Sequence, residues 1–399
     1  LAWAPREHWS IRAGYGIFYV QDIGNALFDI ARNVAGRDGN VISNTNRTTT
    51  LAAPWASETG SAGCPGYNGP CLLAPQLLAN YQGNRSQYVE QYLLVIQREL
   101  TKSLVLEVGY LGSQGHDLQR MIYINQPVYP TSATDTSSIA SRRPWPAYGP
   151  IQMEMNIANS NYNSLEGKLT QRLAKGMTYS LGFTWSKSID DGSGDRDGLL
   201  WPNNSYQLYK ERGPSAFDVP LRVTGNFVYD LPVGPGRAYV NHGILGAVVG
   251  GYQLGGIFTA YTGLPVSSPT TGDLARTGTA NSLYGDCTGI SPYPTDRTMQ
   301  NWWNAAAFDN TNPLLTWNPG NCGRDAFYGI GAWTVDVSVA RTFKIKESHH
   351  VNLRLDAFNS INHANYNTPS DNYQSVTTFG IINSAKTMRQ LQLSLKYVF

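Results

Sequence analysis

The sequence predicts an all-β fold: an antiparallel, up-and-down sheet of about ten strands, each with one apolar and one polar face. Three observations support this prediction. Segments along most of the chain alternate apolar and polar residues, the connections between them alternate between short and long, and residues 389–399 form a two-faced strand that ends in an aromatic residue. The combination is typical of a transmembrane β-barrel with short periplasmic turns and long extracellular loops.

The last strand has the clearest pattern. Successive side chains of a β-strand point to opposite faces, so alternate residues share a face. Its length matches the roughly 9–11 tilted residues with which a strand crosses a bilayer. Val398 is the one apolar exception on the polar face. Leu391, Leu393, Leu395, Tyr397 and Phe399 lie on the apolar face, and Gln390, Gln392, Ser394 and Lys396 lie on the polar face.

The same alternation predicts the other strands. Residues 221–229 and 351–357 are clear cases, whereas the glycine-bearing residues 252–261 are weaker. In chain order, the strands are expected near residues 9–20, 87–98, 104–110, 165–173, 178–186, 221–229, 252–261, 333–339, 351–357 and 389–399.

The connections sort by length. In an up-and-down sheet alternate connections lie at opposite ends, so every long connection would lie at one end and every short one at the other. The connection at 232–250 fits least well because it is longer than a turn. Short connections are expected near 99–101, 174–176, 232–250 and 344–349, and long ones near 21–86, 113–162, 188–218, 263–331 and 361–388.

Charged residues mark the face that points into the barrel. A lipid-facing Arg or Lys would cost about 2–4 kcal/mol near the bilayer centre. The alternate face that carries the charges therefore suits a water-filled lumen. Its charged residues are Glu166, Lys168, Arg172, Arg222, Asp336, Arg354, Asp356 and Lys396.

Composition excludes several classes of function. A net charge of +2 is too small to indicate nucleic-acid binding, and no apolar run is long enough for a transmembrane helix. We find no nucleophile elbow, HExxH motif or phosphate-binding loop, so we predict a non-enzymatic protein without a cofactor. Because the chain begins at Leu1, we expect a fragment or a processed product.

The four cysteines fall into two pairs. Cys64 and Cys71 flank a turn-rich loop, and Cys287 and Cys322 lie further along the chain. An even number at these positions favours two disulfides in an oxidising compartment. The alternative is four free thiols.

One acidic run could bind a cation. Asp190, Asp191, Asp195 and Asp197 lie close together after the strand at 178–186, and carboxylate oxygens are the ligands that Ca²⁺ prefers. The run departs from the EF-hand pattern. The alternative, which we favour, is a solvated polar loop.

Tryptophans are frequent in the expected long loops. Exposed aromatic rings could stack on an incoming sugar or peptide ligand. The alternative, which we favour, is that the loops pack against one another through these rings. The candidates are Trp302, Trp303, Trp317, Trp201 and Trp145.

Several stretches resemble the barrel of TonB-dependent outer-membrane receptors, in particular the group with an N-terminal carboxypeptidase-regulatory-like domain. Their order and spacing match along most of the chain, although no single stretch is specific. They read SIRAGYGIFY at 10–19, FDVP at 217–220, FVYDLP at 227–232, GGIFTAYTGLP at 255–265, WNAAAF at 303–308, GNCGR at 320–324 and DAFNSINH at 356–363.

The resemblance implies a 22-stranded barrel in the outer membrane of a Gram-negative-type bacterium, plugged by an N-terminal domain and energised by the TonB complex. Residues 1–399 would form a partial barrel domain without the plug and the first strands, and would import an unidentified extracellular ligand. The terminal Phe399 resembles the signal read by the barrel-assembly machinery, and truncation there should impair assembly. Lipid, plug and TonB complex are the expected partners.

Three alternatives remain. Residues 10–20 and 389–399 could pair and close a small ten-stranded barrel, although we favour an open edge at residues 9–20 that further strands cover. An outer-membrane barrel or adhesin could bind partners through its loops without transport. A secreted β-sandwich or propeller would instead bury the apolar faces under a second sheet.

Overall fold

The structure is a computed structural model of the 399-residue chain. It describes residues 1–19, 77–132, 134–146, 148–194, 202–267, 276, 284–309, 320–346 and 348–399. None of the helices among these residues is long and apolar enough to cross a membrane.

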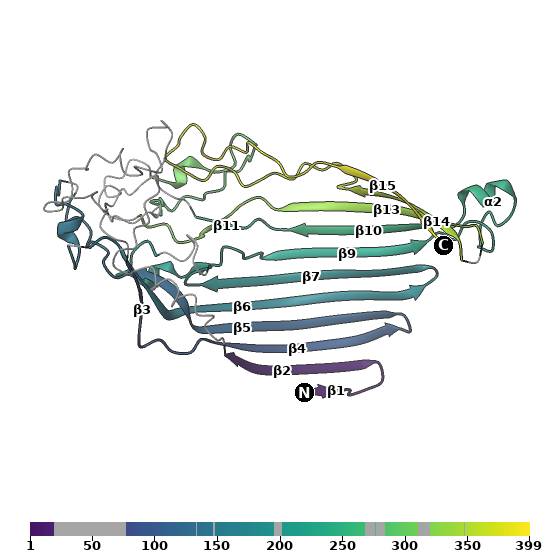
Figure 1. The fold of residues 1–399 in the computed structure, drawn as a ribbon, viewed down its shortest axis with the longest axis horizontal. Coiled ribbons are helices and arrows are strands. Elements are labelled where there is room, and N and C mark those ends of the chain that lie inside the picture. The colour runs from purple at the N-terminus through teal and green to yellow at the C-terminus, as the bar shows by residue number, and fades with distance from the viewer. Residues whose placement is uncertain are drawn as a thin grey trace, which may run out of the picture.

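Strands dominate the described residues (Figure 1). The strands are β1 (Ala2–Trp3), β2 (Trp9–Tyr19), β3 (Leu77–Asn80), β4 (Tyr88–Thr101), β5 (Leu104–Tyr123), β6 (Ile151–Ala174), β7 (Met177–Asp190), β8 (Gly213–Pro214), β9 (Leu221–Asp230), β10 (Tyr252–Tyr261), β11 (Pro265–Val266), β12 (Phe327–Tyr328), β13 (Ala332–Lys344), β14 (His350–Phe358) and β15 (Gln390–Val398). The helices are η2 (Ala140–Arg142), η3 (Leu208–Glu211), α2 (Gly243–Val249) and η4 (Ala305–Ala307).

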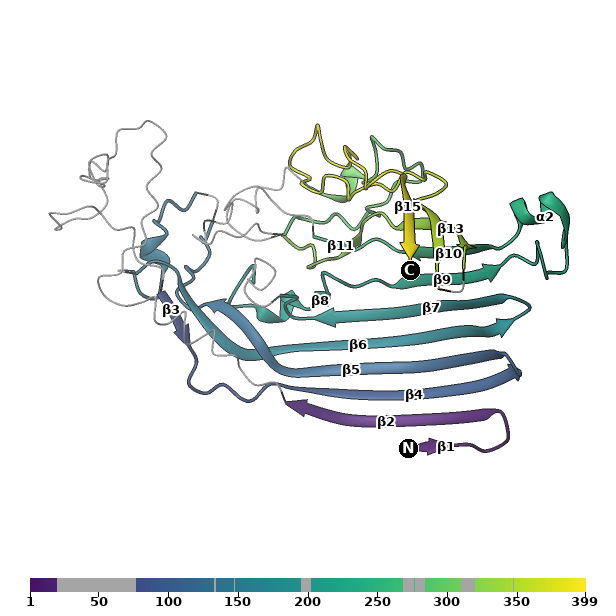
Figure 2. The same cartoon turned by 45° about the vertical axis from the view of Figure 1, so that its right-hand side comes forward.

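The long strands form one antiparallel sheet in chain order, β1-β2-β4-β5-β6-β7-β9-β10-β13-β14-β15. The sheet curves between β7 and β15 but stays open, with β1 and β15 as its two edges (Figure 2). The up-and-down prediction is therefore confirmed. The closed ten-stranded alternative is wrong, because in the described part of the chain β15 pairs only with β14 and β2 pairs only with β1 and β4.

The register places like faces beside one another. Leu355 lies opposite Leu393, and the same alignment recurs where Leu169 lies opposite both Leu106 and Leu181. The result is one continuous surface, which we call the apolar face. Leu391, Leu393 and Leu395 are 67%, 69% and 72% exposed, so no second sheet covers them in the described part of the chain, and the alternative of a secreted β-sandwich or propeller is wrong.

The opposite surface, which we call the polar face, carries the predicted charges. Arg12 pairs with Glu107 at 3.0 Å, and Arg354 donates from Nε to both carboxylate oxygens of Asp356 at 2.9 Å. A cavity of about 360 Å³ opens on this face, lined in part by Glu166 and Lys168. These contacts show how the sheet concentrates its charges on one side.

The predicted asymmetry of the connections is confirmed. The connections β2–β4, β5–β6, β7–β9, β10–β13 and β14–β15 lie at one end, which we call the loop end (Figure 1). The connections β4–β5, β6–β7 and β13–β14 are short turns at the other end, which we call the turn end. The longer β9–β10 connection at the turn end contains α2, which explains why it fits a turn poorly.

Strands β5 and β6 extend furthest beyond their predicted bounds. We expected a loop at 113–162, but β5 continues to Tyr123 and β6 begins at Ile151. At about 3.3 Å per residue, the 24 residues of β6 extend far beyond a hydrocarbon core of about 30 Å. Outside the hydrocarbon layer, strands need not alternate apolar and polar side chains, because no lipid contacts either face. Loops cover β5 and β6 there, and both Tyr123 and Glu154 are buried.

The first strand also differs from expectation. Residues 9–20 were expected to leave an open edge, but β1 covers part of it, with Ala2 opposite Arg12 and Trp3 opposite Ile11. Strand β1 could not be predicted from the sequence, because its two residues are too few to show an alternation of apolar and polar side chains.

We predict that charge is tolerated differently on the two faces of β7. Leu181 lies midway along the apolar face, and Ser180 lies beside it on the polar face. Leu181→Arg should lower the free energy of unfolding in lipid vesicles by about 2–4 kcal/mol, whereas Ser180→Arg should change it little. Equal losses for the two variants, measured by denaturant titration, would contradict the assignment of the faces.

Candidate functional site at the loop end

Loops that are distant in sequence pack together at the loop end around a small apolar core. The Phe308 ring contacts the rings of Phe327, Tyr373 and Phe379 at centroid distances of 5.2, 5.5 and 5.3 Å. The disulfide Cys287–Cys322, with a Cα–Cα distance of 5.1 Å, closes the same core and confirms that predicted pair. Cys64 and Cys71 lie outside the described residues.

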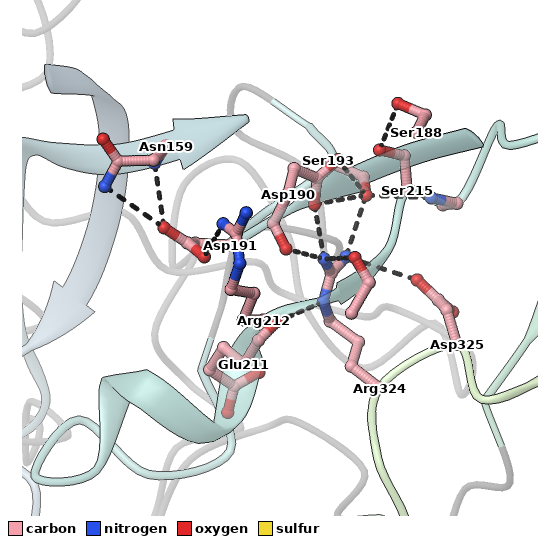
Figure 3. A network of polar contacts seen from close by, with 12 residues as sticks. Asn159, Ser188, Asp190, Asp191, Ser193, Glu211, Arg212, Ser215, Arg324 and Asp325 are labelled. Atoms are coloured by element: carbon pink, nitrogen blue, oxygen red, sulfur yellow. Dashed lines mark hydrogen bonds and ion pairs between the residues drawn. The ribbon is translucent and has the colours of Figure 1, made fainter. Parts of the chain in front are cut away.

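A buried arginine, Arg324, ties the loops to the end of β7 (Figure 3). Its side chain is 7% exposed and forms an ion pair with the buried Asp190. Nη1 donates to Ser193 Oγ at 2.8 Å and to Asp325 Oδ2 at 3.2 Å, and Nε donates to the main-chain carbonyl of Glu211 at 2.7 Å. A buried guanidinium is stable only when its donors are satisfied, so these contacts fix the relative positions of three segments.

Glu211 adds a second buried charge beside this network. The residue is 2% exposed; Asn203 donates its backbone N–H to Oε1, and Tyr284 donates its hydroxyl to Oε2, both at 2.8 Å. No cation lies within ion-pair distance of its carboxylate among the described residues. Burial therefore raises the pKa of Glu211, and burial also raises the pKa of Tyr284, with the nearby carboxylate adding to it.

The β5–β6 loop joins the same cluster. The Gln126 amide Nε2 donates to Asn204 Oδ1 at 3.1 Å, Ser205 donates its backbone N–H to Gln126 Oε1 at 2.8 Å, and the Tyr206 hydroxyl donates to the Gln126 carbonyl at 2.6 Å. Gln126 and Asn204 are both buried. Four of the long connections are thus cross-linked, and the loop end behaves as one packed layer.

The acidic run is partly engaged by arginines. Asp190 pairs with Arg324, and Asp191 accepts from Arg212 Nη1 at 3.2 Å. Asp195 and Asp197 lie outside the described residues. Within the described ranges no three His, Cys, Asp or Glu side chains are grouped to hold a metal ion. Calcium binding by this run stays a prediction.

A second cavity lies on the apolar face at the loop end, and we call it the rim cavity. It has a volume of about 540 Å³ and lies against the ends of β9, β10 and β13. Val223, Ala260 and Trp333 belong to the apolar face and form part of its lining. The loop residues Tyr293, Arg297 and Trp302 line it from the other side.

The predicted tryptophans have different surroundings. Trp302 lines the rim cavity, whereas Trp303 is 3% exposed and its ring centroid lies 5.7 Å from that of Tyr293. Trp145 is exposed, and Trp201 and Trp317 lie outside the described residues. The burial of Trp303 agrees with loop packing. Ligand contact by the tryptophans stays a prediction.

Sequence reasoning missed the residues that hold the loops together. Arg324 ends the GNCGR stretch at 320–324, which was noted for its resemblance and not for its charge. Asp218 lies in the FDVP stretch at 217–220, which was also noted only for its resemblance, and Glu211 stood in no pattern, although both are almost fully buried. Asp218 accepts from the Ser188 backbone N–H at 2.7 Å and from Lys187 Nζ at 2.9 Å. Only the fold brings these partners together.

We predict that Arg324→Met loosens the loop end selectively. The change leaves Asp190 buried without its cation, which typically costs about 3–5 kcal/mol. Hydrogen exchange should accelerate in residues 202–218 and 320–328, while the strand amides of β13 and β14 keep their protection. Arg237→Met, at an exposed position near the turn end, is the control. Unchanged exchange in Arg324→Met would show that the network does not hold the loops.

Glu211 gives the loop end a pH dependence with a definite sign. Because its folded pKa lies above its ordinary value of 4.5, the ionised side chain destabilises the folded state near neutrality, and this cost fades as the pH falls through the folded pKa. Glu211→Gln removes the cost. The stability difference between Glu211→Gln and wild type should therefore shrink from about pH 7.5 to about pH 5. A difference that is constant or grows on acidification, measured by hydrogen exchange, would contradict this.

Comparison with known proteins identifies the architecture. The family model described as outer membrane beta barrel domain matches residues 1–392. No curated protein sequence matches the chain. The outer membrane transporter YddB from Escherichia coli is similar in structure, with 13% identity and a TM-score of 0.50; the alignment covers 98% of this chain and 38% of that one.

Two further solved structures are similar at lower scores. The ferripyoverdine receptor of the Pseudomonas aeruginosa outer membrane has 12% identity and a TM-score of 0.43, with coverage of 100% of this chain and 32% of that one. The FrpB iron transporter from Neisseria meningitidis, in its F5-1 variant, has 12% identity and a TM-score of 0.44, with coverage of 100% and 38%. This chain thus spans well under half the length of each.

The matched family and the open, two-faced sheet agree on location. An apolar face without a covering layer requires lipid, and the chain lies in the outer membrane of a Gram-negative bacterium. With the match covering residues 1–392, the chain belongs to the outer membrane beta barrel domain family.

Proposed function

We propose that the chain is the C-terminal barrel part of a TonB-dependent receptor that imports an extracellular ligand by energised uptake. One observation carries the proposal: the sheet gathers charged side chains such as Glu107, Glu166 and Lys168 on the polar face, opposite the apolar face. Its charges suit a hydrated lumen that contacts a plug domain. These charges would be costly in a barrel whose interior held neither water nor a polar partner.

The open edges support the same proposal. β1 and β15 each have a neighbour on one side only among the described residues. Unpaired strand edges are costly in lipid, so further strands would close a larger barrel around a plug. We propose the TonB complex and the plug as partners, with a carboxypeptidase-regulatory-like domain preceding them. Phe399, at the turn end beyond β15, is proposed as the signal for the barrel-assembly machinery.

A second candidate is a loop-binding outer-membrane protein that does not transport. The cross-linked loop end favours it, because Arg324 and the Cys287–Cys322 disulfide would hold a preformed binding surface. A preformed surface reduces the ordering cost of binding. The same rigidity also suits a receptor that captures its ligand before uptake. The structure of the loops therefore fits both candidate functions, and the two differ in whether they need energy from the TonB complex.

Energy-dependent uptake by the complete protein tests the proposal. Two strains would be compared: the parent strain and a derivative from which the gene for this protein has been deleted. Both would be grown with iron chelates, oligosaccharides, peptides or cobalamin as the limiting nutrient. We expect a growth defect on one class, and labelled uptake of that compound that falls to background when the proton-motive force is dissipated or the TonB protein is removed.

Controls separate the two candidates. Surface binding that survives loss of TonB, without accumulation inside the cell, would favour the loop-binding candidate. Uptake that persists unchanged without TonB would refute energised import. Complementation of the deletion strain with the wild-type gene should restore uptake fully and serves as the control.

A further inference from the structure

A groove lines the apolar face below the rim cavity. Its volume is about 340 Å³, and its walls are almost wholly apolar, with Leu181, Phe227 and Phe258 among them. Two glycines lie on this face among its lining residues, Gly225 opposite Phe258 and Gly256 opposite Phe227. The Phe227 ring lies over Gly256, where a side chain would collide with it, so the aromatic ring packs close to the sheet surface.

The groove and the rim cavity are adjacent along the same strands. Gly225 and Phe258 line the groove, and the next residues on the same face, Val223 and Ala260, line the rim cavity. Residues two apart on a strand share a face, so the two hollows lie next to each other on the apolar face. From Phe227 to Val223 they extend about 13 Å along β9. We call the groove and the rim cavity together the lipid-side channel.

A cation without a carboxylate partner stands at the upper end of the channel. Arg297 is exposed, and its guanidinium carbon lies 4.4 Å from the ring centroid of Tyr293 and 5.2 Å from that of Trp302. Among the described residues no carboxylate lies within 4 Å of it. Lys187 differs, since Asp218 neutralises it at 2.9 Å. The stacked rings hold the Arg297 plane in place and leave its N–H edge available.

The height of Arg297 matches the membrane interface. Trp333, which lines the rim cavity, lies at the loop end of β13, and the exposed Trp185 lies in the half of β7 that is nearer the loop end; both are on the apolar face. Aromatic residues at such positions mark the level of lipid headgroups in outer-membrane barrels. Arg297 lines the same cavity, so its charge lies on the apolar side of the sheet, next to the groove.

We propose that the lipid-side channel binds one phosphate-bearing, acylated lipid of the outer leaflet, with an acyl chain in the groove and a phosphate at Arg297. Arginine binds phosphate through charge-assisted, often bidentate hydrogen bonds, which matches its free N–H edge. The apolar groove favours a ligand that also carries an acyl chain. A water-soluble phosphate compound could bind Arg297 but would leave the groove empty. The site opens on the apolar face, so it is distinct from the proposed uptake route.

The test uses the complete protein in detergent, titrated with diphosphorylated lipid A and with its dephosphorylated form, and bound lipid is counted by native mass spectrometry. Wild type should retain the phosphorylated form preferentially. Arg297→Gln should weaken its binding about tenfold, or ~1.4 kcal/mol, and leave the dephosphorylated form unaffected. Arg297→Lys should restore part of the loss, and the matched control Arg237→Gln should bind as wild type.

A bulky side chain in the rim cavity, next to the groove, tests whether the acyl chain lies in the lipid-side channel. Ala260→Phe should weaken binding of both lipid forms, whereas Ala13→Phe, on the apolar face of the distant β2, should not. Electrophoretic mobility without heating confirms that each variant is folded. Equal binding of the phosphorylated form to wild type and Arg297→Gln, an equal loss for both forms in Arg297→Gln, or unchanged binding to Ala260→Phe would each overturn the proposal.

Discussion

Backbone hydrogen bonding in a medium without water is the constraint on which this structure depends. An unpaired N–H or C=O group in the hydrocarbon region costs several kcal/mol. Each strand from β2 to β14 on the main path therefore pairs on both sides, and the register is kept over long stretches, with irregularities recorded near Glu99, Leu118 and Gln171. Because the strands pair continuously, successive side chains point to opposite faces of the sheet. One face is apolar where it contacts lipid, and the other is polar.

The packed loops at the loop end obey a different constraint, because they lie beyond the regular pairing of the sheet. Stability there comes from side chains. Arg324 satisfies acceptors on segments that are far apart in sequence, and the Cys287–Cys322 disulfide closes the Phe308 core. Burying Arg324 with Asp190, and Glu211 with the Tyr284 hydroxyl, makes these contacts dependent on one another, because loss of one partner leaves the other without compensation. The loops thus hold one arrangement on top of the sheet.

The two faces give the chain two separate environments for ligands. The polar face, with Glu166 and Lys168 near its centre, suits water and a proposed plug and solute route. The apolar face contains the channel that ends at Arg297. Hydrogen bonds connect the rim cavity to the packed loops. Tyr293 and Tyr328 both line the cavity; the Tyr293 hydroxyl accepts from the Tyr328 backbone N–H, and the Tyr328 hydroxyl donates to Asp218.

Much of the sheet could be predicted from the sequence, because a strand with one lipid-exposed face must alternate apolar and polar side chains. Leu391, Leu393 and Leu395 predict β15 without any information on its neighbours. The order of long and short connections follows from antiparallel pairing. The extensions of β5 and β6 beyond the membrane could not, since alternation ends where lipid ends. Nor could the contacts of Arg324 with Asp190 and of Glu211 with Tyr284. These contacts depend on distances between segments separated by tens of residues, and only the tertiary structure sets those distances.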